Sequence, residues 1–92
     1  MIQNVMLKRN QTLSRDDILR ILNTAKSTYQ YAKFNFGNNY YIQITYNRDL
    51  TISMSTNSRD LALYQEIQDL IKIYTQMRLV DFVFRYINKL NK

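Results

Sequence analysis

The sequence predicts an α+β domain in which a helix, a β-hairpin and two further helices follow one another along the chain. The spacing of apolar residues changes from a helical period to strict alternation near residue 40 and becomes helical again after residue 57. The 92 residues include no proline and a single glycine, Gly37, so few positions interrupt regular elements. With 46% hydrophobic residues, a single domain over 1–92 has enough apolar material for a core.

The first third of the chain predicts one helix behind a short N-terminal segment. Residues 1–13 form either an arm or a short strand that extends the hairpin. A helix is expected over 14–33, because Ser14 and Asp17 have the spacing of a capping box. Its apolar residues fall on one face, which we expect to be buried. These residues are Ile18, Ile21, Leu22, Ala25, Tyr29 and Ala32.

Residues 40–56 alternate between apolar and polar, which is typical of a β-hairpin. A two-residue loop would mix the two faces, whereas a three-residue loop at 47–49 keeps the apolar residues on one face. The sequence therefore predicts the pairs Tyr46–Leu50, Ile44–Ile52 and Ile42–Met54. The opposite, polar face would carry Tyr41, Gln43, Thr45, Thr51, Ser53 and Ser55.

Two helices are expected at 58–75 and 79–91. A single unbroken helix over this region would measure roughly 50 Å, too long for a domain of this size, so we expect a break near 75–81. Residues 79–86 are also rich in Val and Phe, as a strand would be, but the apolar stripe continues to Leu90 and favours a helix. The buried arc of the first of these helices would comprise Leu63, Tyr64, Ile67, Leu70, Ile71, Tyr74 and Met77.

The residue types that carry most enzyme chemistry are missing. Histidine and cysteine are absent, which excludes His-based catalytic triads, Cys nucleophiles, disulfides and thiolate metal sites. Five of the seven carboxylates have structural positions: four at helix starts or in the hairpin loop, and Asp81 at ion-pair spacing between Arg78 and Arg85. Glu66 and Asp69 remain, but two carboxylates provide too few ligands for a metal ion. We therefore predict no catalytic residue, no metal and no cofactor.

The strongest functional feature is a row of cations near the C-terminus. Its members are Arg78, Arg85, Lys89 and Lys92, which we call the basic stripe. Their spacing places them on one face of the expected helix, opposite its apolar face. Only Asp81 interrupts them, so we expect the basic stripe to face water. Together with a net charge of +6, it favours an anionic partner.

Two weaker sets of candidate binding residues accompany the basic stripe. Arg15, Lys26 and Lys33 would lie along one flank of the 14–33 helix, although such side chains often only cover a neighbouring apolar stripe with their stems. Tyr31 and Tyr41 lie off the apolar stripes and are candidate contact residues, because exposed tyrosines are enriched at interfaces. The remaining tyrosines, at positions 29, 40, 46, 64, 74 and 86, are expected in the core.

Three classes of function remain. The first, which we expect, is a non-catalytic protein-binding module, such as a phage- or plasmid-type inhibitor or adaptor. It would act on a host nucleic-acid-handling machine, either a protein or a ribonucleoprotein; anti-CRISPR-like inhibition is one form. Small size, missing catalytic residues and 17 amide residues, as in AT-rich coding sequences, support it. The second is a DNA- or RNA-binding protein that uses the basic stripe but lacks a known nucleic-acid-binding signature. The third, an enzyme, would need a base other than histidine.

The sequence also predicts the compartment. No apolar leader precedes Lys8 and Arg9, and no uncharged apolar run approaches the ~18 residues that span a bilayer. We therefore expect a cytoplasmic protein without a membrane partner, and the sequence leaves its oligomeric state open.

Overall fold

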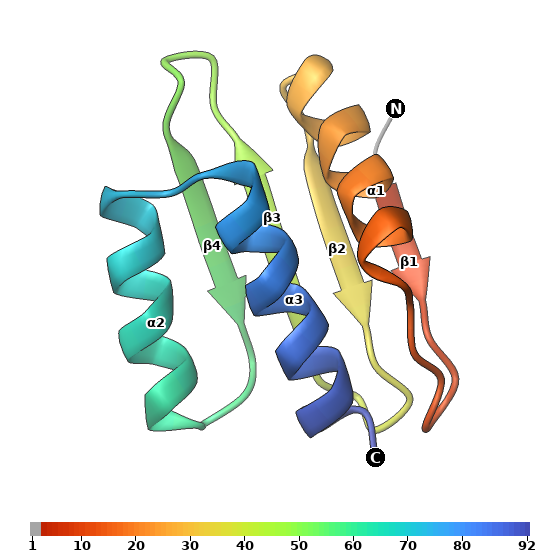
Figure 1. Cartoon of the computed structure of the whole chain (residues 1–92). Helices are drawn as coiled ribbons and strands as arrows, with labels where there is room; N and C mark the ends of the chain where they lie inside the picture. The colour runs from red at the N-terminus through yellow and green to blue at the C-terminus, as the bar shows by residue number, and fades with distance from the viewer. Residues whose placement is uncertain (1–2) are drawn as a thin grey trace.

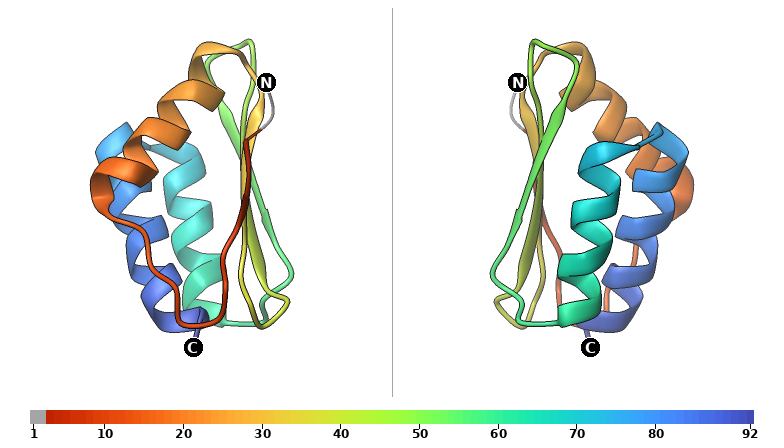
Figure 2. Two further views of the ribbon diagram at one scale, coloured as in Figure 1. Left: turned by 90° about the vertical axis from the view of Figure 1, so that its right-hand side faces the viewer. Right: turned by 90° about the vertical axis from the view of Figure 1, so that its left-hand side faces the viewer.

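A computed structural model describes residues 3–92 and shows a four-stranded sheet with three helices on one of its faces (Figures 1 and 2). The strands lie in the order β1-β2-β3-β4, with β1 parallel to β2 and the other neighbours antiparallel. The predicted α+β class is confirmed, and the N-terminal segment contains a strand, which pairs with β2 and not directly with the predicted hairpin. In chain order the elements are β1 (Gln3–Met6), α1 (Arg15–Ser27), β2 (Tyr31–Asn35), β3 (Tyr41–Tyr46), β4 (Ile52–Thr56), α2 (Leu61–Lys72) and α3 (Gln76–Leu90).

The helix predicted over 14–33 is wrong beyond Ser27, because the chain turns there and continues as β2. The start of the helix is as expected, with the Asp17 N–H donating to the Ser14 hydroxyl (3.1 Å). From residue 31 the side chains alternate between half-buried and buried. The buried set, which includes Phe34, enters the core only because β1 and β3 pair with β2 on either side.

The hairpin has the predicted faces but a different register, because Tyr46 pairs with Ile52 and not with Leu50. Its loop does contain three residues, 48–50, closed by the Asn47 N–H donating to the Thr51 carbonyl (2.9 Å). The loop therefore lies one residue further along the chain than predicted. Since this moves each pairing by two residues, the side chains of β3 and β4 stay on their predicted faces of the sheet. Leu50 leaves the core and belongs to the loop.

Both C-terminal helices are present, with shifted ends. The carboxylate of Asp60 caps α2 by accepting from the Ala62 N–H (3.0 Å), and the hydroxyl of Thr75 caps α3 by accepting from the Arg78 N–H (3.2 Å). The break between the helices occupies residues 73–75, so the prediction of a break near 75–81 is correct only at Thr75, and residues 76–81 already belong to α3. Residues 79–86 are helical, so the alternative of a strand is excluded.

The core lies between the helices and the sheet, and it contains fewer tyrosines than predicted. Tyr46 and Tyr86 are buried, whereas Tyr74 is half-buried. α2 packs near the β4 edge with one side turned outward (Figure 1), which exposes Tyr64 and Ile71, while Tyr29 and Tyr40 lie in turns beside β2 and Met77 lies in the first turn of α3. Besides Leu50, the prediction is therefore wrong for these five residues of the expected core, all of which are exposed.

The side chain of Asn91, which is only 2% exposed, links separate chain segments at the end of the molecule near the C-terminus. Its amide donates to the Lys8 carbonyl (2.8 Å) and the Gln11 carbonyl (2.7 Å), while its oxygen accepts from the Gly37 N–H (2.8 Å). Gly37 lies so close to the backbone of Arg9 that a side chain there would clash. Three segments distant in sequence are therefore fixed together at this end.

Candidate binding surfaces

Three cations of the basic stripe lie on α3 and Lys92 follows the end of this helix, but two of the four are paired with carboxylates of the α2 region. Arg85 donates two hydrogen bonds to Glu66, one of them 3.0 Å long, and Lys89 lies 2.9 Å from Asp60. The hydrogen bonds that Arg85 and Lys89 donate to these carboxylates raise the pKa of both cations, and the bond from Lys89 lowers the pKa of Asp60. Less positive charge is therefore available to an external anion than the sequence predicts.

The second basic row is divided among three places, so its predicted alignment along one helix flank is wrong. Arg15 lies 4.4 Å above the ring of Phe84 and pairs with Asp81 (3.1 Å), which joins α1 to α3. Lys26 borders a pocket at the end of α1. Lys33 belongs to β2, so its side chain lies on the other face of the sheet.

That other face of the sheet is uncovered and carries both tyrosines predicted as contact residues (Figure 2). Tyr31 and Tyr41 are half-buried there, on neighbouring strands, and the Lys33 ammonium lies 4.4 Å from the centre of the Tyr41 ring. None of the strand residues that the structure describes is Asp or Glu. This open sheet face is thus polar and aromatic, with one cation near its middle.

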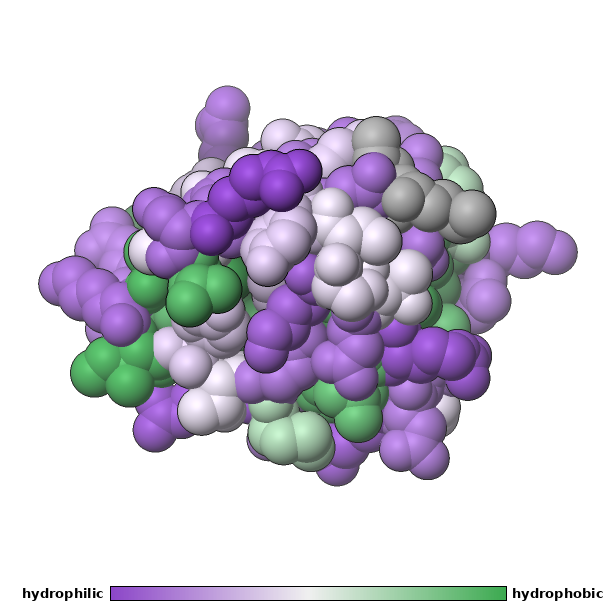
Figure 3. Space-filling view, turned by 90° about the horizontal axis from the view of Figure 1, so that it is seen from above, coloured by the Kyte–Doolittle hydropathy of each residue, from purple (hydrophilic) through white to green (hydrophobic). Residues whose placement is uncertain are grey.

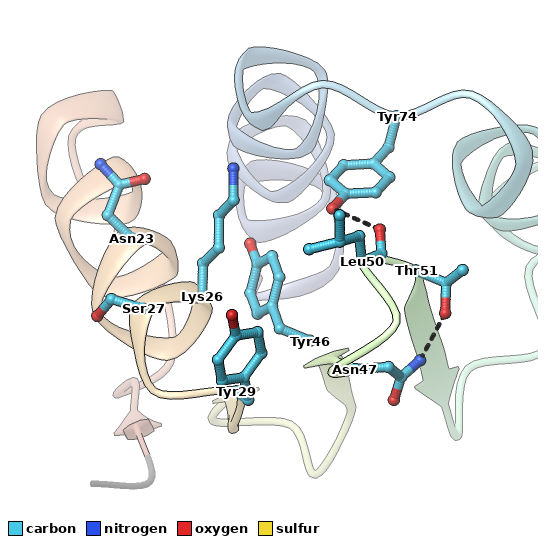
Figure 4. A pocket seen from close by; sticks show the side chains of 9 residues that line it. All are labelled: Asn23, Lys26, Ser27, Tyr29, Tyr46, Asn47, Leu50, Thr51 and Tyr74. Carbon is cyan, nitrogen blue, oxygen red and sulfur yellow. Dashed lines mark hydrogen bonds between the residues drawn. The ribbon is translucent and has the colours of Figure 1, made fainter.

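A pocket of about 370 Å³ opens at the upper end of the molecule in Figure 1, where three connections meet. It lies among the end of α1, the β3–β4 loop and the α2–α3 connection (Figure 4). This pocket could not be predicted from the sequence, because these connections are far apart along the chain. The lining residues are Asn23, Lys26, Ser27, Tyr29, Tyr46, Asn47, Leu50, Thr51 and Tyr74.

The base of the pocket has its polar groups mutually satisfied. The Tyr46 hydroxyl donates to the side-chain oxygen of Gln76 (3.0 Å), and the Gln76 amide donates to Asn23 (3.1 Å). Burial raises the pKa of Tyr46 well above its ordinary value, so the hydroxyl stays protonated at neutral pH. A molecule entering the pocket would therefore meet aromatic surface at the base and not an unpaired charge.

Two residues at the mouth of the pocket have a costly backbone conformation. Tyr29 and Leu50 lie in the left-handed region, with φ of 51° and 71°. Asn10 and Asn39 also have positive φ, but asparagine tolerates this region, whereas other L-residues lose roughly 1–2 kcal/mol there. Strained backbone that persists outside the core is often found at functional sites.

Exposed apolar side chains extend from this mouth onto the α2–α3 connection. Leu50 is 76% exposed, Ile73 71% and Met77 54%. The Tyr74 hydroxyl donates to the Leu50 carbonyl (3.5 Å), which places the connection beside the hairpin loop. Seen from this end, hydrophobic groups lie among hydrophilic ones (Figure 3). We call Tyr29, Leu50, Ile73, Tyr74 and Met77 the apolar rim.

Within residues 3–92, no three carboxylates gather as a candidate metal site, and no helix is both long and apolar enough to cross a bilayer. No protein-family model matches the chain, and neither a curated protein nor a solved structure shows significant similarity to it.

Proposed function

We propose that the protein is a non-catalytic protein-binding module that docks through the apolar rim. The observation that carries this proposal is the exposure of Leu50 and Ile73, 76% and 71%, on two adjacent connections. Large apolar side chains that share one exposed surface are typical of protein interfaces. A strained backbone at Leu50 adds support, because a loop selected for stability alone would place glycine or asparagine there.

Composition supports a narrower form of the proposal. The small size, the net charge of +6 and the abundance of amides favour a phage- or plasmid-type inhibitor or adaptor. Its partner would be a host protein or ribonucleoprotein that handles nucleic acid in the cytoplasm, and anti-CRISPR-like inhibition is one such activity. The basic stripe would then contribute at the border of the contact or to the association rate.

A pull-down from a bacterial host lysate tests the proposal. Wild-type protein is compared with a Leu50→Ala/Ile73→Ala variant and with Tyr41→Ala, a matched control on the open sheet face. We expect a protein partner that survives nuclease treatment, is retained by Tyr41→Ala and is lost by the rim variant. A partner that disappears with nuclease, or that the rim variant retains in full, contradicts docking through the rim.

The open sheet face favours a second candidate function, the binding of single-stranded nucleic acid. Tyr31 and Tyr41 offer two ring surfaces on neighbouring strands, and Lys33 lies between them in a region without carboxylates. Stacking of a base on such a ring contributes about 1–3 kcal/mol. If this candidate holds, Tyr41→Ala weakens binding of a single-stranded oligonucleotide at least several-fold while Leu50→Ala leaves it unchanged; the opposite pattern contradicts it.

A further inference from the structure

We propose that the pocket beside the apolar rim binds an acidic segment of the partner protein, with one large apolar side chain inserted among Tyr29, Tyr46 and Tyr74. This inference rests on the proposed function and specifies the chemistry of the partner. It combines three features of the pocket: its size and lining, the cations around its mouth, and the fixed conformation of its mouth.

The size and lining of the pocket suit an inserted apolar side chain. A volume of about 370 Å³ is at the lower end of the range for ligand sites. Three tyrosines and Leu50 provide most of its large lining groups (Figure 4). Because the Tyr46 hydroxyl is already bonded to Gln76, an apolar group at the base would leave no buried donor unpaired.

The mouth carries an excess of positive charge. Segments 23–30, 46–51 and 72–78 contain four cations and one carboxylate, that of Asp49. Thr51 donates to Asp49 from its hydroxyl (2.6 Å) and from its N–H (3.1 Å). The four cations are Lys26, Arg48, Lys72 and Arg78. Within the described residues, none of the four cations forms an ion pair. Arg78 lines a separate cavity beside Glu66, Asp69 and Asp81, so the cations available to carboxylates of a partner at the pocket are Lys26 and Arg48.

Two of these cations are positioned at the pocket itself. Lys26 lines it from the last turn of α1, with its ammonium directed away from the base (Figure 4). The Arg48 guanidinium lies 5.1 Å from the centre of the Tyr29 ring. A guanidinium held near a ring still has N–H groups available to a carboxylate. An apolar side chain flanked by Asp or Glu matches this arrangement, with the apolar group inside and the acids at the mouth.

The left-handed backbone at Tyr29 and Leu50 fixes the mouth before a partner arrives. A residue stays in this conformation only where its surroundings hold it. At Leu50 these surroundings include the turn hydrogen bond from its own N–H to the Asn47 carbonyl (3.2 Å) and the Tyr74 hydroxyl on its carbonyl. A mouth ordered in advance lowers the entropy lost on binding.

Selection from a display library of random 12-residue peptides tests the inference with a defined probe. Wild-type protein and a Lys26→Glu/Arg48→Glu variant are used as separate baits. We expect the wild type to enrich peptides in which one large apolar residue has Asp or Glu beside it. The charge-reversed variant should enrich basic neighbours instead, and should bind the wild-type peptides about tenfold or more weakly.

A matched variant, Lys8→Glu/Arg59→Glu, reverses two exposed cations that lie away from the pocket and form no ion pair among the described residues, and it should keep the wild-type peptides. Tyr29→Ala, which removes a pocket wall, should no longer bind these peptides, while its melting temperature stays unchanged.

The inference is overturned if the peptides selected by the wild type lack the combination of an acidic and a large apolar residue, or if they bind all variants equally. It is also overturned if a single-stranded oligonucleotide occupies the pocket and no peptide does. The outcome is separable from the pull-down: a nuclease-resistant partner that needs Leu50 and Ile73 supports the proposed function even when the peptides show no acidic preference.

Discussion

Leu50 combines two properties that folding alone does not favour, a left-handed backbone and a large apolar side chain that is 76% exposed. Glycine at this position would remove the steric cost without losing a buried contact. The presence of leucine at this position is therefore better explained by contact of its side chain with a partner than by a contribution to stability.

Replacing Leu50 with glycine should make the protein more stable while weakening its binding to the partner. Relief of the left-handed strain is worth up to about 1 kcal/mol, or a few degrees in melting temperature for a domain of this size. Leu50→Ala is the matched control, because it retains the Cβ atom and therefore the strain. It should bind as poorly as the glycine variant and melt like the wild type. A glycine variant that melts several degrees lower would show that the Leu50 side chain stabilises the fold.

Asn91 has the opposite character, since it is a polar residue next to the end of the sequence and yet buried. Asn91→Ala removes the partners of the Lys8 and Gln11 carbonyls and of the Gly37 N–H. Each unsatisfied buried group costs about 1–3 kcal/mol, so we expect a loss of roughly 3 kcal/mol or more. The melting temperature should fall by more than about 10 °C.

Asn88→Ala, at an exposed position near the end of α3, serves as the control and should melt like the wild type. Asn91→Asp should be nearly as unstable as the alanine variant, because a carboxylate retains the shape but cannot donate to two carbonyls. Equal melting of all these proteins would mean that the Asn91 contacts do not persist in solution.

At the scale of elements, the sequence predicted those parts of the fold that depend on one stretch of chain. The faces of the hairpin follow from local alternation, so they are correct although the register differs by two residues. β2 was missed because Tyr29 and Ala32 continue the helical stripe of α1, and because a strand is recognised by neighbours that are distant in sequence. The pocket and the pairing of the basic stripe with α2 could not be predicted, because both depend on how the elements pack together. The spacing of residues along α3 carries no information about that packing.

The pairing between α2 and α3 should appear in the pH dependence of stability. Because the pKa of Asp60 is lowered in the folded protein from 3.8, chiefly by its hydrogen bond to Lys89, the folded chain keeps this charge to lower pH than the unfolded chain does. The resulting stabilisation is complete above the unfolded pKa and is lost as the pH falls through the folded one. The wild type should therefore lose melting temperature below about pH 4.

Asp60→Asn isolates this effect, because asparagine caps a helix about as well as aspartate but cannot pair with Lys89. Its melting temperature should fall less between pH 6 and pH 2.5 than that of the wild type. Some dependence should remain, since hydrogen bonds also lower the pKa values of Asp17 and Asp49. Parallel melting profiles for the two proteins would show that the Lys89 pair contributes nothing.

At the scale of the whole molecule, the net charge of +6 is spread over several surfaces rather than gathered into one. Carboxylates pair with Arg15, Arg20, Arg85 and Lys89, and the remaining cations are scattered over the pocket, the open sheet face, the two ends of α2, the start of α3 and both ends of the chain. This distribution is a poor match for a nucleic-acid duplex, whose phosphates form a continuous line of charge.

The affinity for a 20-base-pair duplex should therefore be low and should depend weakly on salt. If all four cations of the basic stripe contacted phosphates, log affinity would fall with log salt at a slope of about −3.6. With Arg85 and Lys89 held by Glu66 and Asp60, two cations remain and the slope should be no steeper than about −2. Fluorescence anisotropy at about 50 to 200 mM salt measures the affinity and distinguishes the two slopes.

Glu66→Gln supplies the control, since it frees Arg85 and should steepen the slope by about one. A wild-type slope between about −3 and −4 that Glu66→Gln leaves unchanged would show that the stripe acts as one unit on a duplex, and that its pairs with α2 open when the duplex binds.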